Sequence, residues 1–262
     1  MKYAGRDNWR IAITILVIAT LTTCLFGKSA FGDEKVDALI QQGDALVEAH
    51  QLRAALETFE RADTLAPDRV DILLRISQQC GELIAVAASP EEARRFATVS
   101  LADAKRSVEL APDNAKAHLC LAIAYGRMTD FTDNRTKIEY SKLIRDESLK
   151  SIALDPTDDY AWHVIGRWHA GVAGLNPLLK FLANLVYGGM PDASYEEAAK
   201  YLKKATEIAP QRILHHQHLA KVYMALGKSD LARKEWQAVL KIPATDNDDE
   251  KAHREAKQAL GQ

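Results

Sequence analysis

The residues best suited to binding chemistry lie in the second half of the chain, at intervals that place them on one face of successive helices. Three cations, an aromatic ring and a histidine in this set could bind a carboxylate or a phosphate. Leu119, Ile123 and Leu214 would supply an apolar wall beside them. The alternative is that Arg167 and Lys221 pair with acids of adjacent helices. The candidate binding residues are Lys116, Tyr160, His163, Arg167, Gln217 and Lys221.

The other polar clusters are poor candidates for catalysis or metal binding. His215, His216 and His218 lack the His-Glu-x-x-His pattern and would point to different faces of one helix. The acidic run 246–250 lacks the central glycine of a calcium loop, so helix capping explains it better. The sequence also contains no Gly-x-Ser-x-Gly, no P-loop and no dinucleotide fingerprint. We therefore predict a protein that is not an enzyme and has no cofactor and no metal site.

Four apolar helical patterns end in nearly the same way, at Leu65-Ala66-Pro67, Leu110-Ala111-Pro112, Leu154-Asp155-Pro156 and Ile208-Ala209-Pro210. A helix-ending proline at a fixed place in a repeated unit is typical of a helical solenoid. Residues 36–69 follow the 34-residue tetratricopeptide pattern most closely, with the small Gly43 where two helices would cross and the large Phe59 between turns. The sequence therefore predicts an all-α, tetratricopeptide-like right-handed solenoid of about five helix pairs plus a C-terminal capping helix.

In such an array the first helix of each pair lines a concave face, and the six candidate residues occupy the positions that face it. The first two units place Asp37, Asp44, Asp71 and Gln78 at the corresponding positions. The groove is therefore predicted to be acidic at one end and basic at the other. The net charge of −2 is too balanced to indicate a nucleic-acid partner.

The spacing of the repeats is irregular, because successive helix-ending prolines lie 45, 44 and 54 residues apart. The longest spacing exceeds the 34-residue unit by 20 residues and contains an apolar interruption at residues 171–193. We expect it to fold back as a short helix over the solenoid and to shield one end of the concave face. The alternatives are a lid over a lipid chain or an interfacial membrane helix, and the single cation Lys180 disfavours the membrane version.

The first 32 residues have the layout of a secretory signal peptide. Lys2, Arg6 and Arg10 precede an apolar run at 11–26, which is short for a membrane-spanning helix. We expect cleavage after Gly32, which leaves a solenoid domain at residues 33–262 in the bacterial periplasm. The alternative is an uncleaved N-terminal membrane anchor. Export would permit a disulfide between the two remaining cysteines, Cys80 and Cys120, although two cysteines on neighbouring helices are more often core residues.

The most specific pieces of the second half are residues 163–168 and the interruption that ends at Tyr187-Gly188, followed by the segments 194–198, 219–223, 226–228 and 243–256. Together they are similar to the regulator of microtubule dynamics family of tetratricopeptide-like proteins. The resemblance runs from about residue 115 to 260, with a weaker continuation back to about 36. It departs from the family at Ala220, where glycine is usual, and at Ala209 and Gln211, where Asp-Pro-Asn is usual. The resemblance implies the fold; some animal members are anchored at mitochondria and linked to membrane contacts and lipid binding.

An exported chain of bacterial type has no microtubules to regulate, so the family name does not by itself supply a function. We predict a non-catalytic, exported binding or scaffold module that holds a peptide segment or a partner protein in its concave groove. The alternative is a lipid-binding or lipid-transfer module that takes up a phospholipid, with residues 171–193 as its lid. Contact with a membrane is expected only through an uncleaved N-terminus.

Overall fold

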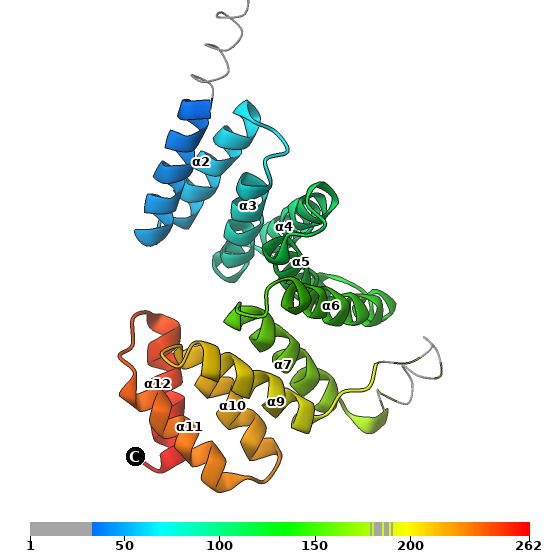
Figure 1. The fold of residues 1–262 in the computed structure, drawn as a ribbon, viewed down its shortest axis with the longest axis vertical. Helices are drawn as coiled ribbons and strands as arrows, with labels where there is room; N and C mark the ends of the chain where they lie inside the picture. The colour runs from blue at the N-terminus through cyan, green and yellow to red at the C-terminus, as the bar shows by residue number, and fades with distance from the viewer. Residues whose placement is uncertain (1–32, 179, 181–184, 186–188, 190) are drawn as a thin grey trace, which may run out of the picture.

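The computed structural model describes residues 33–178, 180, 185, 189 and 191–262. The predicted signal peptide lies outside these residues, as do residues 179, 181–184, 186–188 and 190 of the predicted lid. The described chain is built from helices and their connections, with no strand among its described residues. Figure 1 shows the helices stacked in antiparallel pairs along the chain. The predicted all-α, tetratricopeptide-like solenoid is confirmed.

Five helix pairs follow one another, and a final helix covers the end of the array. The pairs are residues 33–48 with α2 (Leu52–Leu65), α3 (Val70–Leu83) with α4 (Pro90–Leu110), α5 (Ala115–Met128) with α6 (Asn134–Leu154), α7 (Asp159–Ala173) with α9 (Tyr195–Ile208), and α10 (Ile213–Ala225) with α11 (Ser229–Lys241). The closing helix is α12 (Asn247–Leu260). Short 3₁₀ turns follow α3 and α5.

The repeated proline phrases end the second helices for a steric reason. The residue before a proline is disfavoured in the helical region, so its ψ turns to a positive value outside that region. At Ala66, Ala111 and Ala209 ψ is 73°, and at Asp155 it is 93°. Each of these four residues directly follows the last helical residue, as the sequence predicts.

Side-chain caps begin several of the helices. The Ser89 hydroxyl accepts a hydrogen bond from the Glu92 amide, and Pro90 is the first residue of α4. The carboxylate of Asp246 accepts one from the amide of Asp249 at the start of α12, at 2.8 Å. The acidic run 246–250 is therefore a helix start, as expected.

The two helices of a pair approach closely at small residues. A Cβ placed on Gly43 would lie 2.3 Å from the ring of Phe59, and one on Gly166 would lie 2.7 Å from the side chain of Leu202. Phe59 and Leu202 are fully buried, so each ring or branch fills the space that the missing Cβ leaves. Cys80 and Cys120 are both unpaired.

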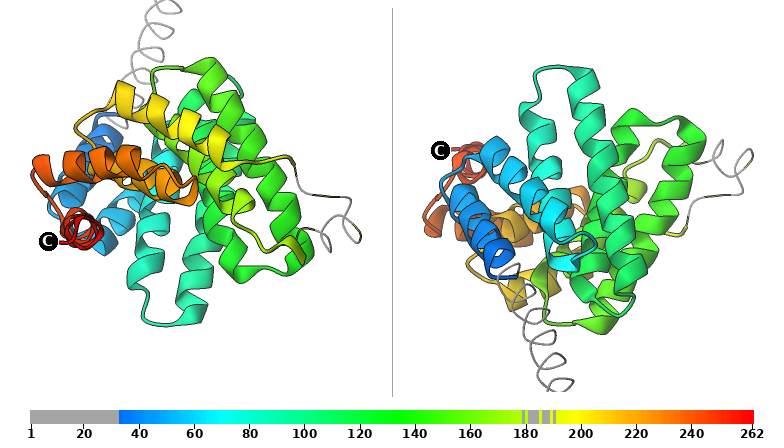
Figure 2. Two further views of the ribbon diagram at one scale, coloured as in Figure 1. Left: turned by 90° about the horizontal axis from the view of Figure 1, so that it is seen from below. Right: turned by 90° about the horizontal axis from the view of Figure 1, so that it is seen from above.

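The first helices of successive pairs form a continuous inner row. α3 contacts α5, α5 contacts α7 and α7 contacts α10, while α12 packs on α10 and α11. The row curves, so that the first pair and α12 lie on one side of the molecule and the middle helices lie on the other (Figures 1 and 2). The inner row therefore lines a concave face. No helix in the described part of the chain is long and apolar enough to cross a membrane.

Candidate functional site

Three adjoining hollows run along the concave face and share their walls. The first, of about 640 Å³, shares Gln78 and Lys116 with the second, of about 700 Å³. The second shares Tyr160, Arg212 and Asp246 with the third, of about 890 Å³. We call this continuous channel the concave groove. It runs from the N-terminal part of α3, across α5, to the N-terminal ends of α7, α10 and α12.

The middle of the concave groove has an apolar floor with polar groups above it. Leu74, Leu119 and Ile123 come from α3 and α5 and line the central hollow. Gln78 and Lys116 are exposed beside them. The Lys116 ammonium forms no ion pair with any described residue, so it remains available to a ligand.

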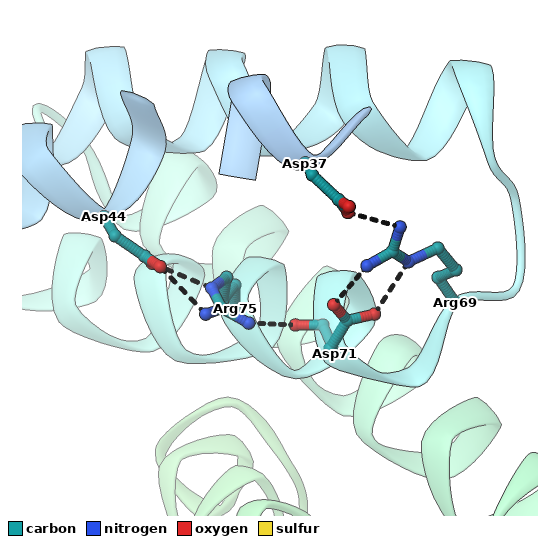
Figure 3. Close-up of polar contacts among 5 residues, drawn as sticks. All are labelled: Asp37, Asp44, Arg69, Asp71 and Arg75. Carbon is teal, nitrogen blue, oxygen red and sulfur yellow. Dashed lines mark hydrogen bonds and ion pairs between the residues drawn. The ribbon is translucent and has the colours of Figure 1, made fainter. Parts of the chain in front are cut away.

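The N-terminal end of the concave groove is not a bare acidic surface. The Arg75 guanidinium donates two hydrogen bonds of 2.8 Å to Asp44, and Arg69 donates to Asp71 at 2.7 and 3.0 Å and to Asp37 at 2.9 Å (Figure 3). The hydrogen bonds from Arg69 hold the pKa of Asp71 below its usual value. The predicted acidic end is therefore wrong, because the neighbouring arginines already neutralise most of its charge.

His163 does not line the concave groove, and the expectation that it faces a ligand there is wrong. Its side chain is 2% exposed and lies between α7 and α10, where its Nδ1 is 2.9 Å from Nδ1 of His215. Its ring stacks on Tyr160, with ring centroids 5.5 Å apart. Burial, together with the nearby His218 and His215, lowers the pKa of His163 to about 2, so the ring is neutral.

The two buried histidines belong to a chain of hydrogen bonds that ends on a carboxylate. His215 Nε2 lies 2.6 Å from Oδ2 of Asp159, which also accepts from Arg212 Nε at 2.9 Å. Because a carboxylate only accepts, His215 donates from Nε2 and accepts at Nδ1 from the Nδ1–H of His163. This tautomer leaves Nε2 of His163 as a bare lone pair, and that atom has no partner among the described residues. The chain is a structural link between α7 and α10.

Gln217 and Lys221 are tied to the closing helix. Both donate to the same oxygen, Oε2 of Glu255, at 2.9 and 2.6 Å. Gln217 is 8% exposed at the edge of the third hollow, and Lys221 lies one helical turn further on. Burial raises the pKa of Glu255, but the hydrogen bonds from Lys221 and Gln217 outweigh it and bring the pKa below its usual value. For Lys221, pairing with an adjacent acid is what the structure shows.

Arg167 lies outside the concave groove as defined above. It borders a separate hollow of about 310 Å³ between α7 and α10, which Lys221 and His218 also line. Of the six predicted residues, the structure thus brings Lys116, Tyr160 and Gln217 to one groove, places Arg167 and Lys221 in another hollow, and buries His163.

Position in a repeat does not reveal the partners of these residues. Arg212 and Asp246 line the concave groove from the residues just before α10 and α12, outside the helical positions that the repeat pattern ranks. Glu255 comes from the capping helix, which has no equivalent in the repeat. The described residues contain no group of three or more His, Cys, Asp or Glu side chains that could hold a metal ion.

A family model decides the relationship of the chain to known proteins. The model described as "Regulator of microtubule dynamics protein 1-3" matches residues 35–262. The chain belongs to this family. The matched range covers the middle units, whose spacing is irregular, as well as the first and last units, which follow the repeat pattern.

Among its relatives, regulator of microtubule dynamics protein 2 of Rattus norvegicus is 26% identical over 232 residues, which are 87% of this chain and 56% of the rat protein. Regulator of microtubule dynamics protein 1 of Mus musculus is 26% identical over 232 residues, which are 86% of this chain and 74% of the mouse protein. The chain therefore spans about half the length of the rat relative.

Solved structures support the fold. A thermophilic TPR protein of Thermus thermophilus superposes with a TM-score of 0.66 at 17% identity, over 87% of this chain and all of that one. PilW, described as a type IV pilus biogenesis factor, gives a TM-score of 0.59 at 15% identity, over 86% of both chains. At these identities the likeness shows the tetratricopeptide-like fold alone.

Proposed function

We propose that this family member is a non-catalytic scaffold that holds an extended segment of a partner protein in the concave groove. The observation that carries the proposal is the continuity of the groove, which three hollows with shared walls form across four inner helices and the start of α12. A channel of this form fits a linear chain better than a compact molecule.

The lining of the concave groove matches the needs of an extended peptide. A peptide brings backbone N–H and C=O groups that must keep hydrogen-bond partners when they leave water. The Gln78 amide, the Lys116 ammonium and the Tyr160 hydroxyl are groups that can supply them. Leu74, Leu119 and Ile123 form an apolar floor that can take one apolar side chain of the peptide.

The polar lining also favours a peptide over a lipid chain. Charged side chains line the groove on both sides of its apolar floor, among them Asp71, Lys116 and Arg212. Asp71 and Arg212 already have ion-pair partners, but an acyl chain would bury the Lys116 ammonium without giving it one, which costs free energy. The lipid-binding alternative further requires a lid at residues 171–193, most of whose central part lies outside the described residues. Phospholipid that co-purifies with the protein in native mass spectrometry would favour that alternative.

The proposal is tested by selecting ligands from a random peptide library displayed on phage, with the purified protein as bait. Lys116→Glu reverses a charge in the middle of the groove without removing an ion pair to a described residue. We expect it to weaken binding of the selected peptides by about tenfold or more, the equivalent of one lost charge-assisted hydrogen bond.

Lys150→Glu is the matched control, because Lys150 is exposed on the outer helix α6 and forms no ion pair with a described residue. It should leave the affinity unchanged. If no peptide is enriched, or if both variants bind selected peptides as the parent does, the concave groove is not the binding site.

A further inference from the structure

The hollow between α7 and α10 is separate from the concave groove and has a different character. Its walls are mostly apolar, and its polar groups are two cations, a histidine and a tyrosine. Its volume of about 310 Å³ is less than half that of the central hollow of the groove. The lining residues that matter are Arg167, Tyr195, Leu202, His218, Lys221 and Val222.

Arg167 is the main cation of this hollow. Its guanidinium is exposed and forms no ion pair within the described part of the chain. The second cation, Lys221, is partly neutralised by Glu255 at 2.6 Å, although its side chain is still 45% exposed. The hollow therefore carries one full positive charge and part of another, with an apolar surface behind them.

One ring nitrogen of His218 forms a hydrogen bond, and the other has no hydrogen-bond partner in the described part of the chain. Its Nδ1 donates to the carbonyl of Leu214 at 2.9 Å, so the neutral ring has an unprotonated Nε2. Burial, and then Arg167, lower the pKa of His218 to about 4. The charged or titratable groups around the ring are Arg167 and His163 from α7, Tyr195 from α9, Lys221 from α10 and Glu255 from α12.

We propose that this hollow binds a carboxylate of the bound peptide, from an acidic side chain or from the peptide's own C-terminus, between the Arg167 guanidinium and His218. The proposal rests on the peptide-binding function proposed above. A guanidinium fork suits a carboxylate because two parallel hydrogen bonds can form, and the apolar walls can pack on the stem that carries it. The small volume excludes a lipid chain.

The geometry predicts a proton-linked signature of binding. A carboxylate beside Arg167 and Lys221 offsets the two positive charges that disfavour a protonated His218, so the pKa of His218 rises when the anion binds. A protonated Nε2 also becomes a donor to the carboxylate. Binding therefore takes up a proton, and affinity rises as the pH falls from 7 toward 5.

The direct test uses acetate and inorganic phosphate as probes on isotope-labelled protein. NMR follows the side-chain resonances of Arg167 and His218 as each anion is added. Acetate should shift both sets saturably and raise the pKa of His218, and Arg167→Gln should abolish the effect. Arg233→Gln is the matched control, because Arg233 is exposed on α11 and forms no ion pair with a described residue.

A second arm uses the peptides selected on the concave groove. Changing the acidic side chain to its amide, or amidating the C-terminus, shows which carboxylate is used, and the responsible change should cost about tenfold or more in affinity. The proposal is overturned if acetate shifts neither residue, if Arg167→Gln binds acetate as before, if only phosphate binds, or if neither peptide change matters. Failure of the library to yield any binding peptide would refute the concave groove itself, while the acetate result on the unliganded protein would still decide this hollow.

Discussion

The two ends of the inner helix row differ in how their charged and titratable side chains are paired. At the N-terminal end, the three aspartates of the first two pairs are matched by Arg69 and Arg75 in half-exposed ion pairs. Toward the C-terminal end, His163 and His215 are buried and neutral, and Arg167 has no acidic partner among the described residues. The ion pairs at the N-terminal end leave few charges there for a ligand. The buried histidines at the C-terminal end link α7 to α10, and Arg167 remains available to a ligand.

The largest effect should come from breaking the buried chain at the C-terminal end. His215→Ala removes a fully buried ring and leaves the Nδ1–H of His163 without its acceptor. Cavity formation and the unsatisfied donor together should cost about 3 kcal/mol of unfolding free energy. Urea denaturation followed by circular dichroism measures this value. A cost below about 1 kcal/mol would show that the hydrogen-bond chain does not hold α7 and α10 together.

Acid should weaken the C-terminal end before it weakens the N-terminal one. In the folded state the pKa of His163 is about 2 and that of His218 about 4, both because of burial, while unfolded histidine titrates near 6.5. Below about pH 6.5 the unfolded state therefore binds more protons, and stability falls as the pH falls. Each histidine contributes up to about 1.4 kcal/mol per pH unit.

The aspartate–arginine pairs at the N-terminal end lose their contribution to stability at a lower pH than the histidines do. Arg69 lowers the pKa of Asp71, so the contribution of this pair is present above about pH 4 and is lost only below it. Urea denaturation at pH 7, 6 and 5 should show a steady decline that is smaller in a His218→Gln variant. Stability that stays constant over this range would contradict the buried neutral histidines.

On α4, one half-buried carboxyl group should respond to acid in the opposite direction. Burial raises the pKa of Asp103 to about 6, and Asp63 and Glu60 add to the effect. Between about pH 6 and pH 4 the folded state therefore holds a proton that the unfolded state lacks, so this group stabilises the fold as the pH falls. Asp103→Asn should add about 1 kcal/mol at pH 7. A loss of stability at pH 7 would mean that a hydrogen bond or an ion pair stabilises the ionised Asp103 carboxylate.

The smallest effect is expected for the ion pairs at the N-terminal end. Arg75→Ala removes two hydrogen bonds to Asp44, but both side chains are a third or more exposed. Pairs of this kind contribute about 0.5–1 kcal/mol, and less in high salt. Thermal melts at low and high salt check this value. A cost equal to that of His215→Ala would remove the contrast between the two ends.

The elements were predictable because their signals are local. The residue before each repeated proline is forced out of the helical region by its neighbour, so the ends of α2, α4, α6 and α9 follow from three residues each. Ser89 and Asp246 cap their helices through contacts three residues away, which a sequence pattern also contains.

The site was only partly predictable because its partners come from other helices. The repeat pattern ranks the positions that face inward, and this placed Lys116 and Tyr160 correctly on the groove wall. It could not show that His163 meets His215 from a helix 52 residues away, since burial depends on how the pairs pack. Likewise, the neutralisation of Asp37 by Arg69 depends on a contact between two units.

Site-specific photocrosslinking would show whether a peptide lies in the concave groove. A benzophenone amino acid would replace Gln78, which is exposed at the junction of the first two hollows, or Arg233 on the outer helix α11 as the control. A selected peptide is expected to crosslink to position 78 and not to position 233. Crosslinking at 233 with none at 78 would contradict this expectation.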